Sequence, residues 1–234
     1  MTAKNLGQII AIGGGGFGRN PHQAKIEKYI LEQSDKKKPK VCFIPTASAE
    51  NSDYIVNFYT AFSRFECELT HISFFKRTPN LKSILNKQDI IYVGGGNTKS
   101  MLAVWKEWKL DQVLLKAYQR GAILCGVSAG AICWFEYGIT DSWASHLNTI
   151  ECLNFLPGCC CPHYDGEEAR RPYVTSLITD GKRNSCYAIE DGAALHFKDN
   201  KVHTAISFDK NKKSYYVSLK DQSVCEEEIS GEAL

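Results

Sequence analysis

The first candidate for a catalytic residue in this chain of 234 residues is a serine that lies between two glycines. Gly126-Val-Ser128-Ala-Gly130 is a G-x-S-x-G pattern that follows an apolar, strand-like run and precedes a helix-like segment. The glycines permit the tight bend of a nucleophile elbow, because larger side chains would collide with the neighbouring strand and helix. We therefore predict that Ser128 is a nucleophile. The alternative is a glycine-rich turn in which this serine caps a helix.

A serine nucleophile needs amide groups that stabilise the oxyanion of the reaction. A second strand-like run leads into Gly94-Gly-Gly96-Asn97. The carboxyl ends of parallel strands share one edge of a sheet, so we expect these glycines to face Ser128. The amides of Gly96 and Ala129 are the predicted oxyanion donors. Asn97 is a predicted substrate-binding residue, and the alternative role for it is to cap the following helix.

A third glycine segment, residues 13–18, contains G-x-G-x-x-G after the first strand-like run. A dinucleotide site would also require an acidic residue at the end of the second strand. That run ends in Phe43-Ile44-Pro45-Thr46, and the first acid after it is Glu50. We therefore expect no nucleotide cofactor, and we interpret these glycines as a place where the backbone approaches the site closely.

The general base should be a histidine that is held in one orientation. His163 lies between Pro162 and Tyr164, and the proline fixes the backbone just before the imidazole. His146 lies in a polar turn and is the weaker candidate. Three other histidines are within strand-like runs, where a structural role is more common: His71, His196 and His203.

The elements that position these residues alternate between short β-branched runs and segments of helical period, which predicts βα units around a mostly parallel sheet. The expected strands are 9–12, 41–44, 68–72, 90–93 and 122–127, and the expected helices are 23–33, 53–65, 98–106 and 110–119. Runs at 187–189, 193–197, 202–206 and 215–217 are separated by turn signals and predict antiparallel strands at the edge of this sheet. We expect one domain, 1–234, with a frayed tail at 224–234.

Composition excludes several classes of protein. The 28 basic and 26 acidic residues leave a net charge of +2, which gives no field for nucleic acid. The apolar runs are too short to span a membrane, and the N-terminus lacks the features of a signal peptide, so we expect a cytoplasmic protein. The 10 cysteines include no C-x-x-C pair, and the run 159–161 cannot direct three thiolates at one zinc ion. We expect free, structural cysteines and no metal.

Taken in order, the segments 94–97, 126–130 and 162–164 resemble the serine peptidase family of dipeptidase E (aspartyl dipeptidase) and cyanophycinase. The resemblance covers nearly the whole chain. It implies an α/β fold in which a mostly parallel central sheet forms a three-layer sandwich, as in class I glutamine amidotransferases. It also implies that Ser128 is the nucleophile and His163 is the base.

The family also has a carboxylate that orients the histidine. The resemblance implies that this residue lies between Ser128 and His163, and we match it to Asp141. Glu136 and Asp165 are the alternatives. A carboxylate there would hold the correct tautomer of the imidazole and stabilise the imidazolium.

Members that resemble dipeptidase E remove an N-terminal aspartate from small peptides and use no metal or organic cofactor. They need a cation for the substrate carboxylate, which Arg170 and Arg171 could supply. The alternative for at least one of these arginines is surface charge. A cyanophycinase-like or other amide hydrolase and a non-catalytic protein that binds a small ligand are the competing functions. A monomer and a homodimer are both compatible with the sequence.

Overall fold

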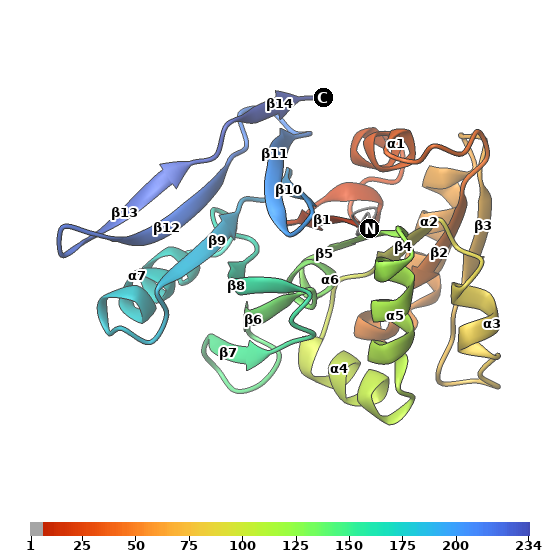
Figure 1. The fold of residues 1–234 in the computed structure, drawn as a ribbon, viewed down its shortest axis with the longest axis horizontal. Helices are drawn as coiled ribbons and strands as arrows, with labels where there is room; N and C mark the ends of the chain where they lie inside the picture. Colours follow the sequence, from red (N-terminus) through yellow and green to blue (C-terminus); the bar gives the residue numbers. More distant parts are fainter. Residues whose placement is uncertain (1–6) are drawn as a thin grey trace, which may run out of the picture.

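Residues 7–234 are described by a computed structural model, which is a mixed α/β fold with two sheets. One sheet has eight strands in the order β14-β11-β10-β1-β5-β4-β2-β3, and the other has six in the order β13-β12-β9-β8-β6-β7. Figure 1 shows the six-stranded sheet and α7 on the left, and the helices α1 to α5 around the parallel strands on the right.

The parallel half of the eight-stranded sheet confirms the predicted βα units. Strands β1 (Gln8–Ile12), β5 (Ile123–Val127), β4 (Ile90–Val93), β2 (Lys40–Ile44) and β3 (Glu68–His71) run in the same direction. Strands β1, β5, β4 and β2 are almost wholly buried because helices cover both faces, which is why they read as continuous apolar runs.

The helices on the two faces belong to separate apolar clusters. Helices α1 (Lys25–Glu32) and α2 (Ser52–Phe62) pack on one face. Helices α3 (Leu81–Leu85), α4 (Thr98–Glu107) and α5 (Leu110–Gln119) pack on the other. Helix α3 was not predicted, because five residues are too few to show a helical period. No helix in the described part of the chain is long and apolar enough to cross a membrane.

The second sheet differs from the expectation of a single sheet. It contains β6 (Phe135–Thr140), β7 (Asn148–Glu151), β8 (Leu156–Cys161), β9 (Ser185–Ile189), β12 (Ser214–Lys220) and β13 (Ser223–Glu228). Helix α7 (Arg170–Thr179) connects β8 to β9, which run parallel. Of the four late runs, only β10 (Ala193–Lys198) and β11 (Lys201–Ser207) extend the first sheet as antiparallel strands.

The prediction of a frayed tail was wrong. Residues 224–234 contribute to β13 and to β14 (Gly231–Ala233), which pair with β12 and β11, respectively. The run Glu226-Glu227-Glu228 suggested a solvated end, but β13 is an edge strand, where charged side chains are common. All ten cysteines are free, and burial raises the pKa of the Cys160 thiol well above its usual value. Such thiols stay protonated and pack as apolar groups.

Candidate active site

The bend between β5 and the short helix α6 (Ala129–Ile132) presents Ser128. Its backbone has φ 56° and ψ −113°, an uncommon conformation for a residue with a side chain. A Cβ atom on Gly126 would lie 2.4 Å from the carbonyl oxygen of Gly130, and one on Gly130 would lie 2.1 Å from that of Val93. Only glycine therefore fits at either position, as the pattern predicted.

A chain of hydrogen bonds connects three side chains at this bend. His163, which follows β8, has its Nε2 atom 2.8 Å from Ser128 Oγ. Its Nδ1 atom lies 2.6 Å from Asp191 Oδ1, and Asp191 follows β9. The side chains of His163 and Asp191 are only 13% and 19% exposed. The nucleophile thus comes from one sheet, and the imidazole and the carboxylate come from the other.

The charge on Asp191 fixes the direction of these hydrogen bonds. Burial alone would raise the pKa of Asp191, but hydrogen bonds from His163 and Arg19 outweigh it and lower the pKa to about 2. Arg19 Nη1 donates to Asp191 Oδ2 at 2.6 Å. The ionised carboxylate can only accept, so His163 Nδ1 carries the hydrogen. Its Nε2 atom is then free to accept the proton of the Ser128 hydroxyl.

The glycine segment after β1 allows this contact to form. A Cβ atom on Gly14 would lie 1.8 Å from Asp191 Oδ1 and 2.7 Å from His163 Nδ1. The backbone of Gly14 also forms an isolated parallel bridge with Asp191, and its carbonyl oxygen accepts from the Gly192 amide at 2.9 Å. Close backbone approach therefore accounts for the glycine at position 14.

Asp141, which we predicted to orient the histidine, does not contact His163. Its side chain is 69% exposed, and Oδ1 lies 3.9 Å from Arg170 Nη2. Of the two alternatives, Glu136 accepts from the Gly158 amide, and Asp165 accepts from the backbone amide of Asp191. Neither is bonded to the imidazole in the described residues.

Asp191 takes the place expected for Asp141. The carboxylate that contacts His163 therefore follows the histidine in the sequence rather than preceding it. Strands β8 and β9 are parallel neighbours, with Cys161 opposite Ala188, so their carboxyl ends lie side by side. His163 leaves the end of one strand and Asp191 leaves the end of the other. The sequence signal was Asp191-Gly192, which we interpreted only as a turn between strands.

The predicted substrate-binding residues have different surroundings. Arg170 is buried, with Nε donating to Glu167 at 2.7 Å and Nη1 to the Ile139 carbonyl at 3.0 Å. Arg171 lines neither pocket that contains Ser128; it pairs with Glu226, and its guanidinium is 4.3 Å from the ring centroid of Tyr164.

The amide of Asn97 is occupied by local contacts. Its Oδ1 atom accepts from the Ser100 amide as the cap of α4, and its Nδ2 atom donates to the Ser142 carbonyl, each at 2.8 Å. This is the capping alternative. Asn97 still lines a pocket at the serine, but its side chain holds the loop at Ser142 in place.

Two pockets adjoin the serine, and Ser128 and His163 line both of them. The larger, about 350 Å³, is also lined by Gly96, Asn97, Asp141, Ser142, Glu167 and Arg170, and we call it the Arg170 pocket. The smaller, about 200 Å³, is also lined by Gly15, Gly18, Arg19, Tyr54, Gly95 and Val127, and we call it the Arg19 pocket. The amide hydrogens of Gly96 and Ala129, the predicted oxyanion donors, have no acceptor within residues 7–234.

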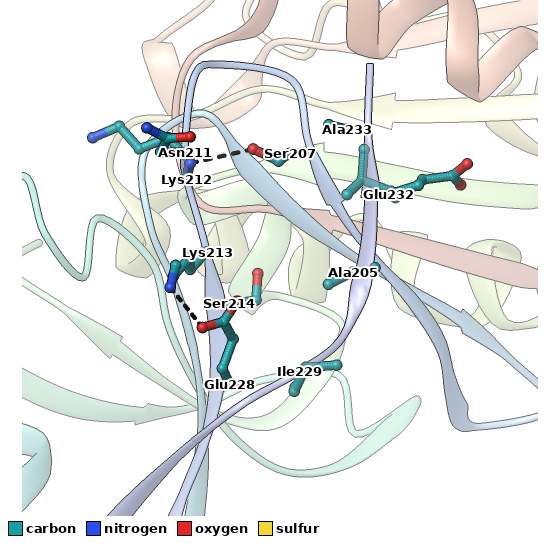
Figure 2. Close-up of a pocket in the computed structure, with 12 residues that line it drawn as sticks. Ala205, Ser207, Asn211, Lys212, Lys213, Ser214, Glu228, Ile229, Glu232 and Ala233 are labelled. Carbon is teal, nitrogen blue, oxygen red and sulfur yellow. Dashed lines mark hydrogen bonds and ion pairs between the residues drawn. The ribbon is translucent and has the colours of Figure 1, made fainter.

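A larger pocket of about 540 Å³ lies elsewhere, between β11 and β14 on one side and β12 and β13 on the other. Figure 2 shows Lys213 paired with Glu228 along its wall. Lys212, also in the wall, pairs with Asp165. Ser128, His163 and Asp191 are not among the residues that line this pocket. Within residues 7–234, no cluster of three or more His, Cys, Asp or Glu side chains is arranged to hold a metal ion.

Comparison with known proteins shows the family of this chain. The chain is 46% identical over 220 residues to the uncharacterized peptidase YgaJ of Bacillus subtilis (strain 168), covering 94% of this chain and 95% of that protein. It is 26% identical over 176 residues to Peptidase E of Actinobacillus pleuropneumoniae serotype 7, covering 70% of this chain and 74% of that protein.

The crystal structure of a peptidase from an acI-B1 Actinobacterium has the same fold, with a TM-score of 0.73 at 18% identity, covering 97% of this chain and 96% of that one. Residues 9–205 match the model of peptidase family S51. The match covers most of the chain, including Ser128, His163 and Asp191. This chain is therefore a member of peptidase family S51.

Proposed function

We propose that this protein is a serine exopeptidase that hydrolyses short peptides, with dipeptides that begin with aspartate as its substrates. The observation that carries the proposal is the unbroken hydrogen-bond chain from Ser128 Oγ through His163 to Asp191, at 2.8 and 2.6 Å. This geometry supports a triad, because it couples a hydroxyl to a base and the base to an ionised carboxylate.

In the proposed reaction, Ser128 Oγ attacks the carbonyl carbon of the peptide bond while its proton passes to His163 Nε2. The amides of Gly96 and Ala129 stabilise the oxyanion, and each such donor contributes about 3 kcal/mol to the transition state. The imidazolium, stabilised by Asp191, then gives its proton to the leaving amine. An acyl-enzyme remains, and a water molecule activated by the same histidine hydrolyses it.

The charges in the Arg170 pocket fit an N-terminal aspartate. Such a residue carries one anionic side chain and one cationic amine. Arg170 supplies a buried guanidinium, and its Nη2 lies 3.9 Å from Asp141 Oδ1, too far for a hydrogen bond. Asp141 and Glu167 supply two carboxylates, and we propose that they attract the amine while Arg170 binds the side-chain carboxylate.

The first experiment asks whether Ser128 is the nucleophile and which peptides are cleaved. Wild type and Ser128→Ala are incubated with a peptide library, with Asp-Leu and with a β-linked Asp-Arg polymer, and the products are identified by mass spectrometry. A fluorophosphonate probe is applied in parallel. The control variant is Ser63→Ala, which removes an exposed hydroxyl at the end of α2.

We expect wild type and Ser63→Ala to release aspartate from Asp-Leu and to be labelled, whereas Ser128→Ala does neither. Cleavage of the polymer in preference to the dipeptide would contradict the proposed substrate and leave the assignment of Ser128 as the nucleophile unchanged. Absence of both labelling and hydrolysis in wild type would contradict the serine peptidase mechanism and favour a protein that only binds a ligand.

A further inference from the structure

The smaller pocket at the serine is lined by one arginine and by no acidic side chain. Arg19 lines the Arg19 pocket, and its side chain is 59% exposed. One of its nitrogens, Nη1, is held by Asp191 Oδ2 at 2.6 Å. Because a guanidinium has five N–H donors, the hydrogen bond to Asp191 leaves others available to a ligand. Arg19 is thus fixed beside the triad with unused donor capacity.

The charges of the two pockets match the two halves of a dipeptide. The Arg170 pocket combines one guanidinium with two carboxylates, from Asp141 and Glu167. The Arg19 pocket has one guanidinium and no acidic side chain among its lining residues. In Asp-Xaa, the second residue contributes its nitrogen to the scissile amide, so its α-carboxylate is the only charge on its backbone. A cationic pocket complements that residue.

We propose that Arg19 binds the terminal α-carboxylate of the leaving residue and so selects dipeptides over longer or capped peptides. This inference rests on the proposed function, since it assigns the leaving residue to the Arg19 pocket. The Arg19 pocket, at about 200 Å³, is smaller than the Arg170 pocket, at about 350 Å³. Gly15 and Gly18 lie in its wall, where larger residues would narrow it.

The competing role for Arg19 is to position Asp191. If Arg19 only held the Asp191 carboxylate, its loss would change the kinetic constants of every substrate equally, because Asp191 acts through His163 and not through the leaving group. An arginine that binds the α-carboxylate should discriminate between a free acid and its amide. The ratio of the two substrates therefore separates the roles.

The experiment measures kcat and KM for Asp-Leu and for Asp-Leu amide with wild type, Arg19→Gln, Arg19→Lys and the control Arg77→Gln, an exposed arginine on the loop after β3. In Arg19→Gln, loss of a charge-assisted hydrogen bond should raise KM for Asp-Leu by about 10- to 100-fold. KM for Asp-Leu amide should change by less than about threefold. Arg19→Lys should recover part of the difference, and Arg77→Gln should match wild type.

Binding is measured separately from turnover, so that failure of the proposed function is recognised. Ser128→Ala, with and without Arg19→Gln, is titrated with Asp-Leu and its amide in a calorimeter. A preference for the acid that disappears with Arg19→Gln supports the inference even if wild type hydrolyses neither peptide. An equal loss on both substrates, or no preference for the acid in the Ser128→Ala protein, would overturn it.

Discussion

The exchange of Asp191 for asparagine tests the triad most directly. Asp191 Oδ1 lies 2.6 Å from His163 Nδ1, and hydrogen bonds keep the pKa of Asp191 near 2. Asparagine has nearly the same shape, but its amide can donate to Nδ1 and thereby favour the tautomer with the hydrogen on Nε2. In that tautomer the imidazole cannot accept the proton of Ser128.

The expected loss is large and confined to kcat. In a serine triad, removing the carboxylate in this way lowers kcat by about 10⁴-fold, which corresponds to about 5.5 kcal/mol of transition-state stabilisation. Asp191 does not line either pocket at the serine, so KM for Asp-Leu should stay within about threefold of wild type. Steady-state kinetics at neutral pH give both constants.

Asp141→Asn is the matched control, because it makes the same chemical change at a side chain that is 69% exposed and does not contact His163. We expect it to raise KM by weakening the attraction for the substrate amine and to change kcat by less than about tenfold. If Asp141→Asn lowered kcat by orders of magnitude while Asp191→Asn remained active, the assignment of the orienting residue would be refuted. Thermal unfolding of both variants separates catalysis from misfolding.

Three further predictions concern Gly14, Glu27 and Arg171. Gly14→Ala should lower kcat/KM by about 100-fold or more, because its Cβ atom would displace the carboxylate of Asp191; an unchanged rate in a variant with normal circular dichroism would contradict this. Burial raises the pKa of Glu27 from 4.5 to about 7. The folded state therefore binds this proton more tightly, and unfolding free energy should fall as pH rises from 4.5 to 7, by about 3 kcal/mol. The test compares melting temperatures at pH 5 and pH 8. The decrease seen in wild type should be absent in Glu27→Gln, and an equally large decrease in the variant would refute this explanation. Arg171→Gln should lower the unfolding free energy measured in urea by about 1 kcal/mol, because the contact of the guanidinium with an aromatic ring is lost. It should leave kcat/KM for Asp-Leu unchanged. Reduced binding of Asp-Leu would instead show that this arginine is a substrate-binding residue.

The parallel half of the first sheet could be predicted because its signals are local. Strands β2, β4 and β5 are continuous apolar runs between amphipathic segments, and the predicted bounds of β4 and α5 equal those of the structure. The elbow at Ser128 was equally visible, because its glycines are required within five residues of sequence. In each case, the determining contacts lie within the segment or one strand away.

The second sheet could not be predicted in this way. Strands β6 and β8 are parallel neighbours, and β7, which lies between them in sequence, pairs on the outer side of β6. Their sequences include Gly138, Gly158 and three consecutive cysteines, which show neither alternation nor a strong β-branched pattern. The pairing is decided by packing against the rest of the chain, and local propensity contributes little.

The same limit explains why Asp191 escaped the sequence analysis. Its distance from His163 depends on the parallel register of β8 and β9 and on the backbone of Gly14 passing between the two sheets. Nothing near Asp191 marks it as different from an aspartate in an ordinary Asp-Gly turn. A resemblance between families could suggest a carboxylate, but it placed that residue on the wrong side of the histidine.

The position of β1 explains why a glycine segment is needed there. The end of β1 lies between β5 and β10. The Ile12 carbonyl accepts from the Ser128 amide at 3.0 Å, and the Gly13 amide donates to the Ala193 carbonyl at 3.0 Å. The next residue, Gly14, therefore has to pass between Ser128's sheet and the loop that carries Asp191. Gly14 lies outside the named strands, and a side chain there would collide with the Asp191 carboxylate and the His163 imidazole. Substitution there should consequently reduce activity far more than stability, which is the opposite of what a glycine in a simple turn would show.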